Sequence, residues 1–204
     1  MNFRTISFFL LVTFYFVSTA VLADSDSNSG QFWNSNNCVA SKWSDANDNP
    51  ISIEQKFGEG SMAVTRCLSK TKHVKVLYQI NTECKNSQCG APYAVGNIIN
   101  HINDFEITHG MDSGDYEIVV IVHSGGWKLV LDNNALEKHA ADNPFQAAME
   151  DLVARPSVKV LFCQNTANSK GVVKANMIDK IGFVTAGVSA IADLQDEGYR
   201  YVQP

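Results

Sequence analysis

From residue 73 onward, the chain alternates short apolar runs with stretches that are apolar on one side only. Runs rich in β-branched and aromatic residues occupy 73–80, 116–122 and 158–163, and shorter runs follow at 182–187 and 199–202. Their length and composition predict β-strands, the last of them a short edge strand. The run YEIVVIV at 116–122 is apolar almost throughout, which is typical of a strand buried on both faces of a parallel sheet.

Between these runs, apolar residues recur every three to four positions, which predicts amphipathic helices. One helix opens after Pro92, a second is capped by Asp142 or Asn143 with Pro144 at its first position, and a last one stops at Gly198. Their apolar faces consist of Ala94, Val95, Ile98, Ile99 and Ile102, then Phe145, Ala148, Met149, Leu152 and Val153, then Val188, Ile191 and Leu194. Weaker patterns predict short helices at 59–69 and 172–178. This alternation predicts an α/β domain whose parallel sheet is covered on both faces.

The first 71 residues have a different composition and predict two further segments. Arg4, an apolar run and the small residues ending in Val21-Leu22-Ala23 indicate a signal peptide at 1–23, with an uncleaved anchor as the alternative. Residues 24–71 begin as a Ser-, Asn- and Asp-rich leader without periodicity, and the α/β domain is expected at 72–204. We therefore expect a periplasmic or secreted protein that has no membrane segment once the signal is removed.

Charge and motif spacing narrow the function further. The net charge of −5 comes without basic clusters, which argues against binding to nucleic acid or to an anionic membrane surface. Gly125-Gly126 lacks the spacing of a phosphate-binding loop, so a tight turn is the preferred interpretation. His73, His101, His109 and His139 are expected to be solvated, and no metal site or cofactor is expected.

Five cysteines in an exported chain invite pairing and leave one odd thiol. The candidates for disulfides are Cys38, Cys67, Cys84 and Cys89, and Cys163 is left free. Sequence alone allows fifteen arrangements, of which Cys38 with Cys67 and Cys84 with Cys89 is the preferred one. A metal site built on Cys84 and Cys89 is the alternative. The same pair, on a loop expected at the same sheet edge as Cys163, is either a structural staple or a partner in thiol exchange.

Cys163 ends a predicted strand, which is where ligands and reactive groups gather in α/β sheets. Backbone N–H groups of the following helix start would lower the pKa of its thiol, and Lys170 would add positive charge. His123 leaves a neighbouring strand end as either a base or a hydrogen-bonded turn residue. The other candidate binding residues after strand ends are Asn81, Ser124, Gly125, Asn165 and Thr185. An inert core thiol remains the alternative for Cys163.

Three pieces of sequence resemble the exported branch of the DsrE/DsrF-like family. They are Cys163 followed by Gly171-Val172, the helix NPFQAAMEDL before it, and the tail GVSAIADLQDEGYRYVQP. The resemblance covers residues 72–204. It implies a three-layer α/β/α sandwich with a mainly parallel sheet of about five strands, and assembly as a trimer or hexamer. Lys170 stands where cytosolic sulfur-relay members usually have arginine.

Two functions follow from these observations. The resemblance implies that Cys163 accepts sulfane sulfur as a persulfide, as in a sulfur carrier or a sulfurtransferase-like protein, with a donor or acceptor protein as partner. The alternative is a non-catalytic module that binds a small molecule or assembles with partners through the loops after Ile80, Val122, Phe162 and Thr185. The two differ in the exposure of one sulfur atom.

Overall fold

The computed structural model describes residues 42–84 and 90–204. Within them, five strands form one sheet in the order β4-β3-β2-β1-β5, and every neighbouring pair is parallel. The strands are β1 (Val74–Thr82), β2 (Tyr116–Gly125), β3 (Val158–Cys163), β4 (Gly182–Val184) and β5 (Arg200–Val202). The parallel α/β prediction is therefore confirmed, including the short edge strand at the end of the chain.

Register sets which side chains share a face of the sheet. Val76 lies beside Ile118, which lies beside Val158, and these residues belong to the larger core cluster. Leu77 and Val119, one residue further along, point to the opposite face and belong to a smaller cluster. Because side chains alternate along a strand, a single step in the chain changes the face.

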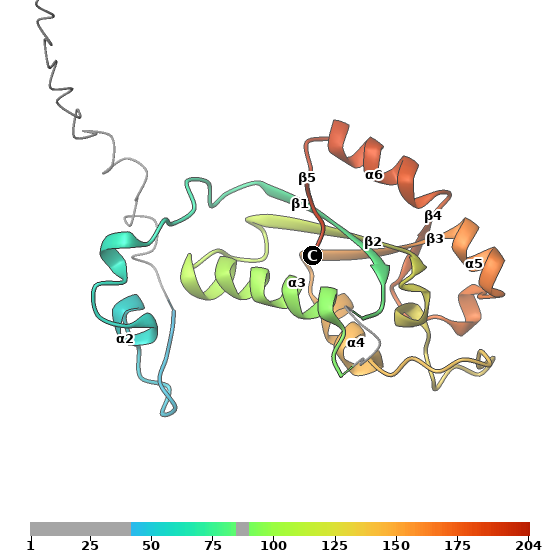
Figure 1. Cartoon of the computed structure of the whole chain (residues 1–204), viewed down its shortest axis with the longest axis horizontal. Coiled ribbons are helices and arrows are strands. Elements are labelled where there is room, and N and C mark those ends of the chain that lie inside the picture. The colour runs from blue at the N-terminus through green and yellow to red at the C-terminus, as the bar shows by residue number, and fades with distance from the viewer. Residues whose placement is uncertain (1–41, 85–89) are drawn as a thin grey trace, which may run out of the picture.

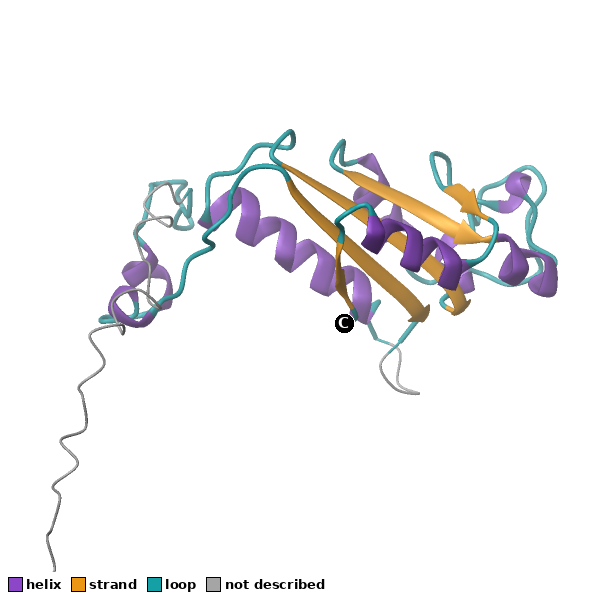
Figure 2. Ribbon diagram, turned by 90° about the horizontal axis from the view of Figure 1, so that it is seen from above, coloured by secondary structure: helices purple, strands orange, loops and turns teal. Residues whose placement is uncertain are grey.

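Helices cover both faces of this sheet, as Figures 1 and 2 show. Packed on the larger cluster are α3 (Tyr93–Asn103) and α4 (Gln146–Ala154), with their predicted apolar stripes turned inward. On the other face lies α6 (Gly187–Asp196), whose Ala190, Ile191 and Leu194 contact the smaller cluster. No apolar side chain of α6 is fully buried, so this face has a thinner cover.

Several predicted helices differ from the observed ones. In the segment predicted as a helix at 59–69, only the 3₁₀ turn Met62–Val64 forms, whereas α2 (Ile53–Phe57), capped by Ser52, lies in a stretch for which no helix was predicted. The second main helix begins at Gln146 and not at Pro144, because the Asn143 side chain accepts the Phe145 N–H in a turn before it. The helix predicted at 172–178 is wrong: a 3₁₀ turn, Lys174–Asn176, stands there.

The predicted signal peptide and the first part of the leader lie outside the described residues. Among the described helices, none is long and apolar enough to cross a membrane.

Candidate functional site

Cys163 is the last residue of β3 and the N-cap residue of α5 (Gln164–Lys170). The expected loop between strand and helix is absent, since α5 starts at the next residue. The helix expected at 172–178 thus lies earlier in the chain: the polar sequence QNTANSK is helical, and Gly171, with a φ of 66°, ends it. The Cys163 thiol is free, and the residue is only 5% exposed.

Hydrogen-bond donors converge on the sulfur of Cys163. Gly187 donates its backbone N–H to Sγ over 3.3 Å from the start of α6. The backbone N–H groups of Thr166 and Asn165 and the hydroxyl of Thr166 act on the same sulfur from the first turn of α5. Burial raises the pKa of the Cys163 thiol, but these donors together outweigh burial and bring the pKa below its ordinary value. The site therefore favours a thiolate without a cationic partner.

A chain of hydrogen bonds runs along the same edge of the sheet from β5 to β2. The Tyr201 hydroxyl donates to Gln79 Oε1, and Gln79 Nε2 lies 2.5 Å from His123 Nε2. Since the Gln79 amide group donates there, the neutral imidazole carries its hydrogen on Nδ1. That nitrogen lies 2.8 Å from Ser124 Oγ, which accepts its hydrogen.

Thr166 joins this chain to Cys163. Its Oγ1 accepts the Ser124 N–H over 3.0 Å, and its hydroxyl also acts on the Cys163 sulfur. Ser124 adopts a φ of 48°, a left-handed conformation uncommon outside glycine, and this turn directs its N–H toward Thr166. These contacts therefore run from β5 across β1 and β2 to Cys163 on β3.

His123 contacts the thiol site through Gly187 and not directly. A Cβ on Gly187 would lie 3.3 Å from the His123 ring, so the ring packs closely against the residue whose N–H binds Cys163. No hydrogen bond between His123 and Cys163 occurs in the described part of the chain. Burial lowers the pKa of His123, which keeps the ring neutral. This geometry favours the hydrogen-bonded histidine over the base.

The other predicted residues divide between the site and its surroundings. Asn165 contributes its backbone N–H to the Cys163 sulfur. Asn81 lies beside Gly125, and a Cβ on Gly125 would lie 2.8 Å from the Asn81 carbonyl oxygen. Gly125 thus permits a close approach of two strand ends, and the predicted tight turn is closed by the Gly126 N–H, which donates to the His123 carbonyl over 3.0 Å. Thr185 is exposed, two residues before Gly187.

Lys170 lies away from the thiol. It ends α5, about 10 Å along the helix axis from Cys163 at 1.5 Å per residue. Its Nζ lies 5.7 Å from the centre of the Trp127 ring, and its carbonyl accepts a hydrogen bond from His139. Its ammonium group thus contacts an aromatic ring, and of the two expected contributions to the thiol pKa only the backbone N–H groups act on Cys163.

Comparison with known proteins shows the family and the fold of the chain. Residues 75–204 match the DsrE/DsrF-like family. The chain belongs to the DsrE/DsrF-like family. A solved structure described as a protein of unknown function, MTH1491 from Methanobacterium thermoautotrophicum, is similar in fold at 20% identity, with a TM-score of 0.50. The match covers 64% of this chain and 99% of that one. A search of curated proteins finds no match.

The cysteines of this family member divide into bonded and free. Cys67 and Cys84 are both in disulfides, and Cys163 is free. Cys38 and Cys89 lie outside the described residues, so the pairing stays a prediction. Within residues 42–84 and 90–204, no three His, Cys, Asp or Glu side chains are grouped to hold a metal ion.

Four residues around Cys163 were not assigned to the site from sequence: Gln79, Thr166, Gly187 and Tyr201. Gln79 and Tyr201 lie on the α6 side of β1 and β5, a placement that needs the strand order, which sequence does not give. For Thr166, the sequence indicates only a residue that caps the loop after the strand. Gly187 acts through its backbone, which carries no sequence signal beyond the start of a helix.

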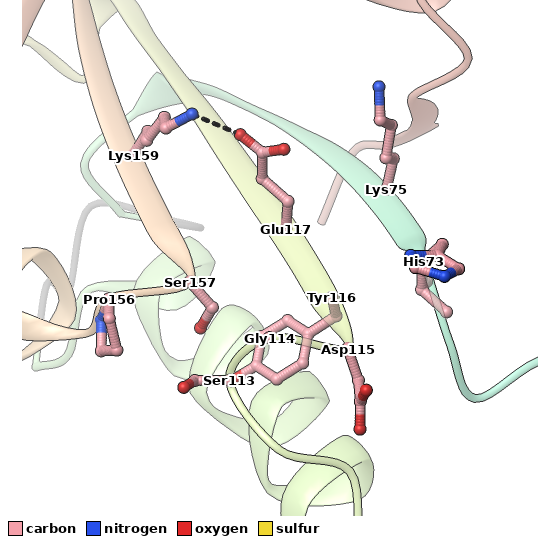
Figure 3. A pocket seen from close by; sticks show the side chains of 11 residues that line it. His73, Lys75, Ser113, Gly114, Asp115, Tyr116, Glu117, Pro156, Ser157 and Lys159 are labelled. Carbon is pink, nitrogen blue, oxygen red and sulfur yellow. Dashed lines mark hydrogen bonds and ion pairs between the residues drawn. The ribbon is translucent and has the colours of Figure 1, made fainter.

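Hollows of the described surface open at the opposite edge of the sheet, where the strands begin. One of 320 Å³ is bordered by the turn at 113–115 and by Lys75, Glu117 and Lys159, as Figure 3 shows. The Lys159 ammonium group lies 2.5 Å from the Glu117 carboxylate. This amino edge is charged and open, and it contains none of the residues predicted for the site. The histidine prediction also fails nearby, because His109 is buried, with 7% exposure.

Proposed function

We propose that this DsrE-like protein carries sulfane sulfur as a persulfide on Cys163, in the periplasm or after secretion. The observation that supports it best is the convergence of N–H and hydroxyl donors on one free thiol at a strand end. Such donors stabilise a thiolate, which is the nucleophilic form of cysteine. Membership in the family and the strand-end position agree with this role.

The proposed step balances without an added oxidant. The Cys163 thiolate attacks the outer sulfur of a donor persulfide, and a new S–S bond forms at Sγ. The donor's S–S bond breaks, and its inner sulfur leaves as a thiolate with the electron pair. The reverse attack by an acceptor thiolate on the outer sulfur of the Cys163 persulfide returns the free Cys163 thiolate.

The same donors suit both free states of the cysteine. The N–H groups of Gly187 and Thr166 act on Sγ, which carries negative charge before it accepts sulfur and again after the sulfur has passed to an acceptor. Because these groups are fixed by the starts of two helices, they need no rearrangement during the reaction. The 5% exposure of Cys163 favours a small donor or a partner that reaches a narrow opening.

Mass spectrometry of the intact protein tests the proposal. The mature chain is incubated with glutathione persulfide, and we expect a gain of one sulfur atom that dithiothreitol removes. Cys163→Ser is expected to gain none. Because Cys67 and Cys84 are in disulfides, a thiol reagent applied to the native chain should label Cys163 first. Absence of any sulfur gain in the wild-type chain would reject the carrier role.

The second candidate is a module that binds or assembles without chemistry at Cys163. The burial of this residue favours it, since a buried thiol can be inert. Under this function, native Cys163 resists iodoacetamide at pH 7 while unfolded protein is labelled. Rapid labelling of the native thiol contradicts it. Assembly as a trimer or hexamer belongs to both candidates, and sedimentation of the mature chain measures it.

A further inference from the structure

A second hollow lies at the edge of the sheet beside β5, far along the strands from Cys163. It measures 430 Å³ and is enclosed by β1, β5, the end of α3 and the segment 68–73 that precedes β1. Cavities of roughly 300–1,000 Å³ hold small organic ligands in many proteins. The volume is thus sufficient for a ligand of modest size.

The floor of this hollow is apolar. Val76 and Phe105 are buried there, Val74 and Val202 are partly buried beside them, and the Leu68 side chain closes one side. The Phe105 ring lies against the His101 ring, with 4.2 Å between the ring centres. Such a floor favours an apolar ligand body, because contact removes hydrocarbon surface from water.

The rim of the hollow carries positive charge and no carboxylate. Lys70 and Arg200 border it, with the imidazole of His73 beside them, and no Asp or Glu is among the lining residues. Within the described residues, Lys70 and Arg200 make no ion pair. The neighbouring Asp115 carboxylate is engaged by Lys72 at 2.5 Å. Lys70 and Arg200, both exposed, therefore lie above an apolar floor without local neutralisation, whereas Lys75, the third cation at the hollow, donates to the Glu197 carbonyl and lies over the Tyr199 ring.

The wall made by the segment 68–73 is held in place. The Leu68 N–H donates to Nε2 of the buried His109 over 3.0 Å, and His109 Nδ1 donates to the Asp104 carbonyl over 2.9 Å. Asp104 begins a π-helical turn, Asp104–Thr108, that continues α3 and supplies Phe105 to the floor. Cys67, next to Leu68, is in a disulfide. The hollow is thus preformed, which reduces the ordering cost of binding.

We propose that this hollow binds an amphipathic organic anion, a monocarboxylate with an apolar body. The carboxylate would pair with Arg200 and Lys70, and the hydrocarbon would lie on Val76, Phe105 and Val202. Arginine suits this role because its planar guanidinium can hold a carboxylate by two hydrogen bonds. An alkylammonium or an alcohol with the same hydrocarbon tail cannot pair with the two cations in this way.

Calorimetric titration with octanoate, 1-octanol, octylammonium and acetate tests this site. We expect binding of octanoate, and at least tenfold weaker binding of each of the other three. Arg200→Gln with Lys70→Gln should weaken octanoate binding at least tenfold, whereas Lys138→Gln, an exposed charge removed elsewhere, should leave it unchanged. Circular dichroism melting confirms that each variant is folded.

The outcomes separate this site from the sulfur site. Octanoate binding that persists in Cys163→Ser supports an independent pocket, whatever the fate of the persulfide. Failure of octanoate to bind overturns the proposal. Equal binding of 1-octanol and octanoate, or undiminished binding by the double variant, shows an unselective apolar surface and overturns it too. Shifts of the Val74 and Val76 methyl resonances on titration identify the pocket directly, and their absence counts against it.

Discussion

The two edges of the sheet are built from different kinds of polar group. At the carboxyl edge, where the strands end, Cys163, His123 and Gln79 are held by hydrogen bonds among uncharged groups and backbone N–H donors. At the amino edge, Lys159 pairs with Glu117 and Lys72 with Asp115, and two hollows open beside them. Among the described residues, the first edge is closely packed around Cys163, and hollows open at the second.

Chain direction explains the difference. In a parallel sheet, each helix that follows a strand starts at the carboxyl edge, so its unpaired N–H groups gather there. Here the starts of α5 and α6 supply the donors to Cys163. The partial positive charge at these helix starts stabilises a thiolate without a charged side chain. Strand starts at the amino edge have no such donors, and charged side chains occupy them instead.

Paired glycine substitutions should show the largest difference between the edges. Gly125→Ala places a Cβ 2.8 Å from the Asn81 carbonyl at the carboxyl edge, so strand ends must move apart. We expect a loss of about 1–3 kcal/mol in unfolding free energy. Gly114→Ala at the amino edge meets nothing within 4 Å, and its effect should stay within about 0.5 kcal/mol. Urea unfolding measures both, and equal effects would contradict the comparison.

The sheet was predictable because its signal is local. An apolar run such as 116–122 and the stripe of Ala94, Val95, Ile98 and Ile102 reflect burial, which periodicity reports directly. The helix α5 was missed because QNTANSK has no apolar stripe. Only Thr166 and Ala167 are buried in it, so position beside Cys163 and not amphipathicity determines it.

The sequence predicted the site residues at strand ends, such as Cys163, His123 and Ser124, but not the contacts that join them. A cysteine at a strand end and the N–H groups that follow it are visible in sequence, but Gly187, 24 residues further along the chain, donates to the same sulfur only because α6 starts beside it. Gln79 and Tyr201 reach the edge only because β5 pairs with β1, on the side away from β2. Strand order is a tertiary property, and no residue pattern in the sequence states it.

The Thr166 hydroxyl gives a sharper test at the carboxyl edge alone. Thr166→Val removes a donor to the Cys163 sulfur and the acceptor of the Ser124 N–H. The pKa of the thiol should rise, so iodoacetamide should react more slowly at pH 7, and the unfolding free energy should fall by about 1 kcal/mol. Thr166→Ser retains the hydroxyl and should behave like the wild type. An unchanged pH profile of alkylation in Thr166→Val would show that backbone donors suffice.

The smallest expected effect is the pH dependence of folding, which begins at a higher pH for His123 than for Glu117. Burial lowers the pKa of His123, so the unfolded chain takes up a proton at a higher pH than the folded one. Unfolding free energy should therefore fall as pH drops below about 6.5, and this loss ends once the folded His123 is protonated. His101, whose pKa is also lowered by burial, adds to the same window.

The carboxylates of the amino edge change charge at a lower pH than the histidines. The hydrogen bond from Lys159 holds the pKa of Glu117 below its usual range, so its contribution is present above about pH 4.3 and is lost as pH falls through the folded pKa. This loss should be less than about 1 kcal/mol, because the Lys159 side chain is 65% exposed. Urea unfolding across pH 8 to 3 should show His123→Gln reducing only the upper decline and Glu117→Gln only the lower one. If His123→Gln leaves the upper decline intact, the chain of hydrogen bonds at the carboxyl edge adds nothing to the pH dependence of folding.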